Sequence, residues 1–230
     1  MTWRQMFTSS IGKKLVMGLT GLFLISFLIV HAGINACIFA NDSGEMFNKA
    51  AHFMASTVLI RIMEVGLFAG IILHIAQGYL LELQNRSSRS VSYDKNLSNK
   101  GSKWYSRSMG LLGTLILLFL ILHLVHFWVP ARFTHEGLEP VSYSTGPVMH
   151  DMFALMKITF SDSLVVVIYV LGCFSLFWHL MHGFLSAFRT LGVGNKKYVA
   201  LLQSIGVGYS ILISLLFAAM PVAVHLKWVQ

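Results

Sequence analysis

Six histidines of the chain lie within long apolar stretches, where ionisable side chains are rare. They are His31, His74, His123, His126, His179 and His182. An imidazole inside a membrane segment is a candidate for function, because its nitrogens bind transition metals and carry protons. The alternative is an imidazole that only hydrogen-bonds a neighbouring helix. The positions of these histidines along the chain help to separate the two interpretations.

The segments that carry the histidines predict an all-α integral membrane protein. The chain has 230 residues, of which 56% are hydrophobic and 11% charged, and its mean hydropathy is +0.70. Five apolar stretches each exceed the roughly 20 residues that a helix needs to cross a bilayer. They span roughly residues 11–40, 54–83, 106–130, 160–188 and 198–226. Backbone polar groups in hydrocarbon must bond internally, and no alternation of the β-barrel type is present. We therefore expect a single membrane domain, residues 1–230, that forms a bundle of five transmembrane helices.

The positive charges predict which segments face the cytoplasm. Lysines and arginines collect near the N-terminus, in and just after the polar loop 84–103, and after the fourth apolar stretch. Cytoplasmic loops of membrane proteins carry an excess of these residues. The N-terminus and the loop 84–103 are therefore predicted to be cytoplasmic, with the C-terminus outside. This topology accounts for the formal net charge of +8 without a nucleic-acid partner.

The first and third apolar stretches each carry a histidine well past their midpoint. His31 lies 17 residues after Lys14, and His123 lies 16 residues after Arg107. At about 1.5 Å per residue, both histidines are expected roughly 25 Å from the cytoplasmic edge of the membrane. They therefore share a depth.

The second and fourth stretches run in the opposite direction and carry their histidines at the opposite depth. His74 lies 13 residues after Arg61, and His179 lies 16 residues after Ser163. Both are expected roughly 20 to 24 Å from the outer edge. The sequence therefore predicts two layers of two histidines, one layer near each membrane face.

Two layers of paired imidazoles suit two haems with both axial positions of each iron filled. Such a bis-histidine centre has no open site for oxygen chemistry, and it transfers electrons. Zinc is a weaker interpretation because the layers offer no matching carboxylate or thiolate cluster. Proton relays usually employ intramembrane acids, and Glu64 is the one candidate of that kind.

The third and fourth stretches each contain a second histidine three residues later, in HLVHFW (123–128) and HLMHGF (179–184). Residues three apart on a helix point within about 60° of each other, so periodicity does not decide between His123 and His126, or between His179 and His182. The depth match favours His123 and His179. The second histidines are candidates for bonds to haem propionates or quinone, or for capping a helix end.

At these histidines the sequence resembles a known family over nearly its whole length. The family is the single-polypeptide, five-helix, dihaem cytochrome b membrane anchor of succinate:quinone oxidoreductases and fumarate reductases, also called complex II. The most specific segments are FLIVHAGIN (27–35), FNKAAHFM (47–54), LHIAQGY (73–79), FLILHLVHFW (119–128) and FWHLMHGFLSAF (177–188).

The resemblance implies two haem b groups with one axial ligand from each of the first four helices. These ligands match His31 and His123 for the iron of the distal haem, and His74 and His179 for the iron of the proximal haem. It also implies a multi-pass protein of the bacterial cytoplasmic (inner) membrane. Two partners are implied on the cytoplasmic face, a flavoprotein subunit with covalent FAD and an iron-sulfur subunit. The chain has neither a dinucleotide-binding glycine fingerprint nor the cysteines for a cluster, so dicarboxylate chemistry is expected in those partners.

The implied function is that of a membrane anchor that passes electrons between the iron-sulfur subunit and membrane quinone, with menaquinone expected. Fumarate reduction by quinol would use the same parts, and further association of complexes is left open. One alternative is a dihaem cytochrome b subunit of another respiratory complex. A non-haem transporter is less favoured, because no inverted repeat with broken helices is evident.

Glu64 is the candidate for a quinone site, because quinone reduction consumes protons as well as electrons and this acid lies close to a helix interior. The alternative is an interfacial ion pair with Arg61, one turn earlier. Trp128 and Arg132 are expected in the aromatic and basic belt of the membrane interface. Arg132 and His126 are also candidates for contacts with the distal propionates.

Overall fold

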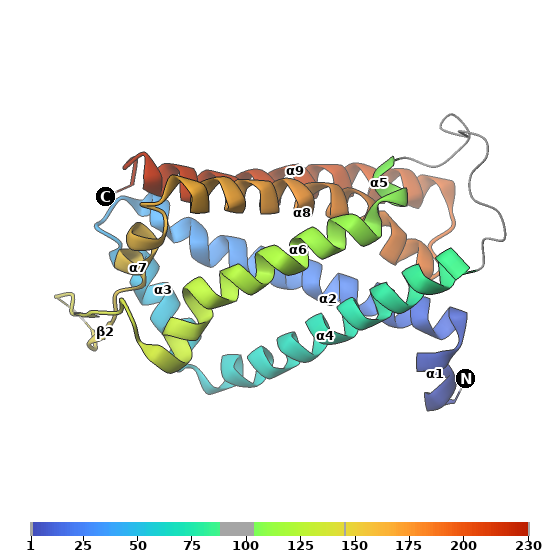
Figure 1. Ribbon diagram of the computed structural model, residues 1–230, viewed down its shortest axis with the longest axis horizontal. Coiled ribbons are helices and arrows are strands. Elements are labelled where there is room, and N and C mark those ends of the chain that lie inside the picture. The colour runs from blue at the N-terminus through green and yellow to red at the C-terminus, as the bar shows by residue number, and fades with distance from the viewer. Residues whose placement is uncertain (1, 88–103, 145, 230) are drawn as a thin grey trace. The chain divides into compact units, whose positions relative to one another are not determined.

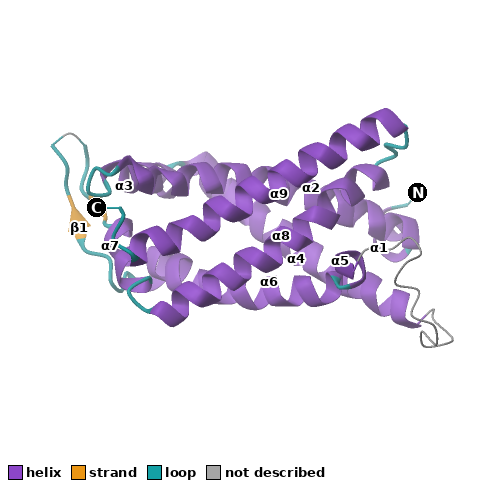
Figure 2. Cartoon of the chain, turned by 90° about the horizontal axis from the view of Figure 1, so that it is seen from above, coloured by secondary structure: helices purple, strands orange, loops and turns teal. Residues whose placement is uncertain are grey.

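The computed structural model describes residues 2–87, 104–144 and 146–229 (Figure 1). Most of this part is helical, and a single pair of two-residue strands is its only sheet (Figure 2). In the described part, five helices are long and apolar enough to cross a membrane: Ser10–Ala40, Val58–Ser87, Met109–Thr134, Ser163–Thr190 and Lys196–His225. The predicted all-α, multi-pass class is confirmed. The cytoplasmic location of the N-terminus stays a prediction.

The first eight elements of the described chain are all helical. In chain order they are α1 (Trp3–Thr8), α2 (Ser10–Ala36), η1 (Cys37–Ala40), α3 (Glu45–Ser56), α4 (Val58–Ser87), α5 (Trp104–Arg107), α6 (Met109–His123) and η2 (Leu124–Trp128). The remaining elements are η3 (Pro130–Thr134), β1 (Pro140–Val141), β2 (Met149–His150), α7 (Met152–Thr159), α8 (Ser163–Thr190) and α9 (Lys196–His225).

The second membrane helix differs most from its predicted bounds of 54–83. Residues 54–56 belong to the separate helix α3, because Thr57 is extended (φ −76°, ψ 121°) and interrupts the helical path before α4 begins at Val58. At its other end α4 continues to Ser87, so the first four residues of the predicted loop 84–103 are helical. The rest of that loop, residues 88–103, lies outside the described residues. The other four stretches agree with their predicted bounds to about one helical turn.

The third membrane helix continues past His123 through wide, π-helical turns. The backbone N–H of Val129 donates to the Leu124 carbonyl, and that of His135 donates to the Pro130 carbonyl. Each bond spans five residues instead of the four of an α-helix. Pro130 has no N–H to donate, which removes one α-helical bond at this point. Wide turns of this kind are frequent at functional sites, and here they carry the span beyond the predicted end at residue 130.

The chain divides into two compact units, where the sequence predicts one membrane domain. Unit 1 comprises Met1–Phe27, Gly66–Leu115 and Ser175–Ile211, and unit 2 comprises Leu28–Val65, Ile116–Phe174 and Leu212–Gln230. Each long helix contributes a segment to both units. The division therefore follows contacts between helices and not a break in the chain.

Unit 1 packs its helix segments closely through glycines. A Cβ at Gly206 would lie 2.8 Å from Cδ1 of Phe184, and a Cβ at Gly70 would lie 3.0 Å from Phe23. The Tyr209 hydroxyl donates to the Ile25 carbonyl at 2.7 Å. Small residues and interhelical hydrogen bonds are the usual means of association between helices in lipid, where apolar burial alone has little driving force.

Unit 2 has a buried core organised around Asn48, which is fully buried. The Asn48 amide donates to the Tyr143 hydroxyl (2.8 Å) and to the Asp151 carboxylate (2.9 Å). Its carbonyl oxygen accepts from the backbone N–H of Phe153 at 3.0 Å. Asp151 also caps α7 by accepting from Ala154 N–H at 2.8 Å. This network gives the FNKAAHFM segment a structural role, because a buried amide needs such partners.

Candidate functional site: two imidazole pairs and a carboxylate cluster

In unit 2, His31 of α2 lies against His123 at the end of α6. Their ring centroids are 5.7 Å apart, and the ring planes are nearly perpendicular at 86°. Phe119, one turn before His123, stacks on its ring at 5.8 Å, and Phe217 of α9 lies 5.5 Å from the ring of His31. The structure therefore brings together the two histidines predicted to form one layer, within an aromatic surround.

In unit 1, His74 of α4 lies against His179 of α8. Their ring centroids are 6.2 Å apart, with an interplanar angle of 67°. Each ring also faces a glycine of another helix. A Cβ at Gly21 would lie 3.5 Å from Cε1 of His74, and a Cβ at Gly113 would lie 3.9 Å from Cε1 of His179. The second predicted pair is thus also together, beside backbone that carries no side chain.

Thr20 of α2 orients the ring of His74. Its hydroxyl lies 2.8 Å from the Val16 carbonyl and 3.2 Å from Nδ1 of His74. Because a carbonyl can only accept, the hydroxyl hydrogen belongs in the shorter contact with Val16, and the hydroxyl oxygen then accepts from Nδ1–H. The free lone pair of His74 is then on Nε2. A metal-binding histidine is commonly held in this way, by a hydrogen bond from its other ring nitrogen.

The ring contacts distinguish the alternatives that are three residues apart. His126 has its Nδ1 3.0 Å from the Tyr169 hydroxyl, and the two rings stack at 5.8 Å with an interplanar angle of 9°. His123, and not His126, forms the ring pair with His31. His179, and not His182, forms the ring pair with His74. The geometry therefore favours the residues that the depth argument favours, and their role as ligands stays a prediction.

The donor sets of these pairs suit some metal groups and not others. Among the described residues, no group of three or more His, Cys, Asp or Glu side chains is placed to hold a metal ion. A protein zinc site usually needs three or four such ligands, whereas an iron porphyrin needs two axial nitrogens. In addition, Nδ1 of His123 and Nδ1 of His179 are buried with no hydrogen-bond partner among the described residues.

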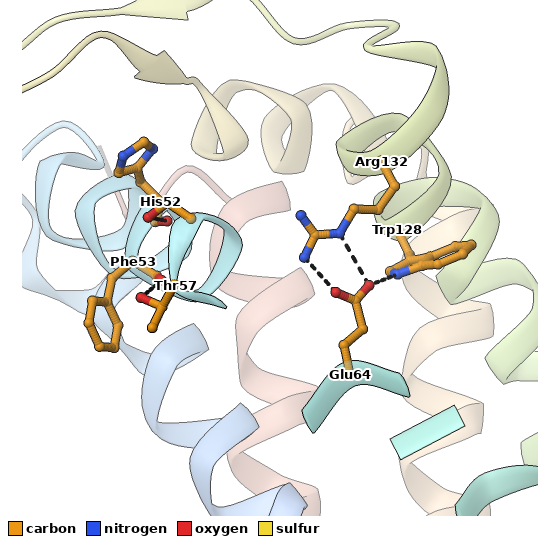
Figure 3. A network of polar contacts seen from close by, with 7 residues as sticks. His52, Phe53, Thr57, Glu64, Trp128 and Arg132 are labelled. Carbon is orange, nitrogen blue, oxygen red and sulfur yellow. Dashed lines mark hydrogen bonds and ion pairs between the residues drawn. The ribbon is translucent and has the colours of Figure 1, made fainter. Parts of the chain in front are cut away.

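Glu64 of α4 is held by two residues from the wide turns that follow His123 (Figure 3). Its Oε1 accepts from Trp128 Nε1 at 2.6 Å and from Arg132 Nε at 3.1 Å, and its Oε2 accepts from Arg132 Nη2 at 2.8 Å. The Arg132 and Glu64 side chains are 14% and 17% exposed. A bidentate pair of this kind is strong and geometrically specific.

This cluster corrects one expectation from the sequence and adds to another. The ion-pair partner of Glu64 is Arg132, 68 residues later, and not Arg61 one turn earlier. Trp128 and Arg132 are bound to a carboxylate, so they do more than populate an interfacial belt. Sequence reasoning also missed Tyr169 and Thr20, because an isolated tyrosine or threonine in an apolar stretch gives no signal of its partner.

Comparison of the chain with protein-family models, with curated proteins and with solved structures finds no match. Support for a function therefore comes from the two imidazole pairs, the Glu64 cluster and the family resemblance of the histidine-bearing segments.

Proposed function

We propose that this chain is the membrane anchor and electron-transfer subunit of a succinate:quinone oxidoreductase. In this proposal it passes electrons between an iron-sulfur subunit and membrane quinone, through two bis-histidine b haems. His31 and His123 hold one haem, and His74 and His179 hold the other.

The observation that carries the proposal is the pairing of four imidazoles from four different helices. An imidazole nitrogen binds a metal at roughly 2 Å, so two axial imidazoles on one iron have ring centres about 6 Å apart. The observed centroid separations are 5.7 Å and 6.2 Å. Four histidines placed only to link helices would have no reason to meet in two pairs at this separation.

The surroundings of the pairs also support haem. Gly21 and Gly113 place no side chain of their own against the His74 and His179 rings. Phe119 and Phe217 give the His31 and His123 pair an apolar setting that excludes water. Haems held by these imidazoles would supply one-electron transfer. The chain's own contribution is to orient the imidazoles and to keep water and oxygen from the metal.

Glu64 is the residue that we propose for proton exchange at the quinone site. Its carboxylate is fixed by three donor contacts from Trp128 and Arg132, yet it keeps some exposure. Proton transfer to a bound quinone requires a titratable group within hydrogen-bond reach. Trp128 and Arg132 follow His123 on the third membrane helix. They therefore connect the Glu64 carboxylate to the helix that carries one histidine of a pair.

The flavoprotein and iron-sulfur partners, the preference for menaquinone and the bacterial inner membrane follow from the family resemblance. A dihaem cytochrome b of another respiratory complex would show the same imidazole pairs, and is the second candidate. The two candidates differ in the soluble subunits that they bind.

The haem assignment predicts that removing either histidine of a pair removes the same haem. His31→Ala and His123→Ala should each retain one haem per chain, with the same spectral component missing. His74→Ala and His179→Ala should each lose the other component. Haem content per chain and reduced-minus-oxidised absorbance spectra measure both quantities.

The matched controls for these variants are His126→Ala and His182→Ala, which remove the neighbouring imidazoles. Both variants should keep two haems, because their rings do not belong to the pairs. A colourless wild-type protein, or equal loss of both haems from every variant, would contradict the pairing.

Thr20→Val should loosen the haem held by His74 and His179 while leaving the other in place. The valine cannot accept from His74 Nδ1–H, and the loss of such a supporting hydrogen bond weakens metal sites by about 10- to 100-fold. The rate of haem transfer to an excess of apomyoglobin measures the effect. Thr114→Val is the control, because its hydroxyl bonds Tyr79 at 2.7 Å and no imidazole. Equal haem retention by both variants would remove Thr20 from the site.

Glu64→Gln should lower quinone reduction by the assembled complex by about 10²-fold, because an amide cannot exchange the proton. Both haems should remain, which absorbance will show. Glu82→Gln is the control on the same helix. Glu82 forms an ion pair with Arg86 at 2.7 Å and is not part of the Glu64 cluster. An unchanged rate in Glu64→Gln with a normal haem content would exclude this role.

The identity of the complex is tested by its partners. Purification through a tag on this chain should yield a flavoprotein with covalently bound flavin and an iron-sulfur protein in equal amounts. Succinate should then reduce the haems. Recovery of different redox subunits, with haems that succinate does not reduce, would favour the second candidate.

A further inference from the structure

A cavity in unit 2 lies where α8 begins and α9 ends, and no histidine of either imidazole pair lines it. Its volume is about 760 Å³, which is in the range of small-molecule sites. Its polar lining comes from Lys157, Lys227, His225, Ser43 and Ser161. Neither imidazole pair nor the Glu64 cluster contributes to it.

The cavity has an excess of positive charge. Among the described residues, none that lines it is an aspartate or a glutamate. The nearby acids are used elsewhere: Asp42 accepts from Met46 N–H at 2.9 Å, and Asp162 accepts from Leu164 N–H at 2.8 Å. In the part of the chain that the structure describes, the three ion pairs involve neither Lys157 nor Lys227. Two lysines therefore share one cavity without a neutralising carboxylate.

Both lysines are held in place by neighbouring structure, Lys157 by an aromatic ring and Lys227 by backbone hydrogen bonds. The ammonium of Lys157 lies 4.8 Å from the ring centroid of Phe153, a side chain that is 1% exposed. Lys227 has a φ of 57° where α9 ends. Its N–H donates to the Val224 carbonyl at 3.1 Å, and the next N–H, of Trp228, donates to Ala223 at 2.9 Å. Glycine is the usual residue at this position, so a lysine is kept here against its backbone preference.

The rest of the lining is apolar or already hydrogen-bonded. Phe160, Val224 and Val229 form buried apolar walls, each under 9% exposed. Nδ1–H of His225 donates to the Phe160 carbonyl at 2.8 Å, and its Nε2 lies 3.3 Å from the Ser163 hydroxyl. Ser163 and His225 are also the terminal residues of two membrane spans. The cavity therefore lies at the ends of two candidate membrane spans and joins positive charge to apolar surface.

We propose that this cavity binds the phosphate of an anionic phospholipid headgroup. The two lysine ammonium groups attract the phosphate, and the apolar walls take the adjoining glycerol and first acyl carbons. A zwitterionic headgroup brings its own cation, which the lysines repel, so anionic lipid is favoured. Free phosphate has no apolar part to occupy the remaining volume.

The test uses the purified full-length chain with its haems and partners, delipidated in detergent. Calorimetric titrations compare short-chain phosphatidylglycerol, short-chain phosphatidylcholine and inorganic phosphate. Phosphatidylglycerol should bind at least about 10-fold more tightly than either of the others. Equal binding of phosphatidylcholine would overturn the charge argument. Equal binding of inorganic phosphate would show a free-anion site and would overturn the assignment to lipid.

The variant for this test is the double change Lys157→Gln with Lys227→Gly, because glycine suits the left-handed backbone at residue 227. It should weaken phosphatidylglycerol binding by roughly 30-fold, from the attraction that two basic residues supply. Lys196→Gln with Lys197→Gln, an exposed pair at the start of α9, should leave it unchanged. Unaltered binding in the first variant would exclude this cavity as the site. Haem content and quinone reduction are independent of this outcome.

Discussion

The constraint on which this structure depends is that hydrocarbon offers no hydrogen-bond partner to the backbone. Every N–H and C=O group within the membrane must bond inside its own segment, and helices achieve this. The backbone is then unavailable for chemistry, apart from positions where a helix widens or ends. Function must come from side chains, and polar or ionisable side chains are few in the five spans. The paired histidines are the most chemically capable of these.

Each imidazole pair is built within the packing of its own unit. In unit 1, His74 is oriented by the Thr20 hydroxyl, which has its own hydrogen engaged by Val16, so that one ring nitrogen is left for a ligand. In unit 2, the rings of His31 and His123 are surrounded by aromatic side chains instead. The two pairs therefore have different polar surroundings. Two metal centres in such different settings would have different reduction potentials, which a chain of electron carriers can use.

The irregular parts of the membrane helices carry the remaining polar chemistry. Wide turns around Pro130 place Trp128 and Arg132 where both reach Glu64. Just after the end of α9, Lys227 similarly has a left-handed backbone conformation. In both places the regular hydrogen bonding of a helix is interrupted. At the first of them, Trp128 and Arg132 meet a residue distant in sequence. The polar sites that we propose near the membrane interface lie at these interruptions.

The number and approximate position of the membrane helices could be determined from the sequence alone, because crossing a bilayer requires about 20 apolar residues and this is a property of each segment by itself. Counting residues along helices of opposite direction also predicts two layers of histidines, one near each membrane face. Tertiary structure decided which side chains of neighbouring helices meet and where the helical path is broken. It distinguished His123 from His126, replaced Arg61 by Arg132 as the partner of Glu64, and separated α3 from α4 at Thr57. Residues three apart differ little in depth, so only a neighbouring helix can show which of them faces a partner.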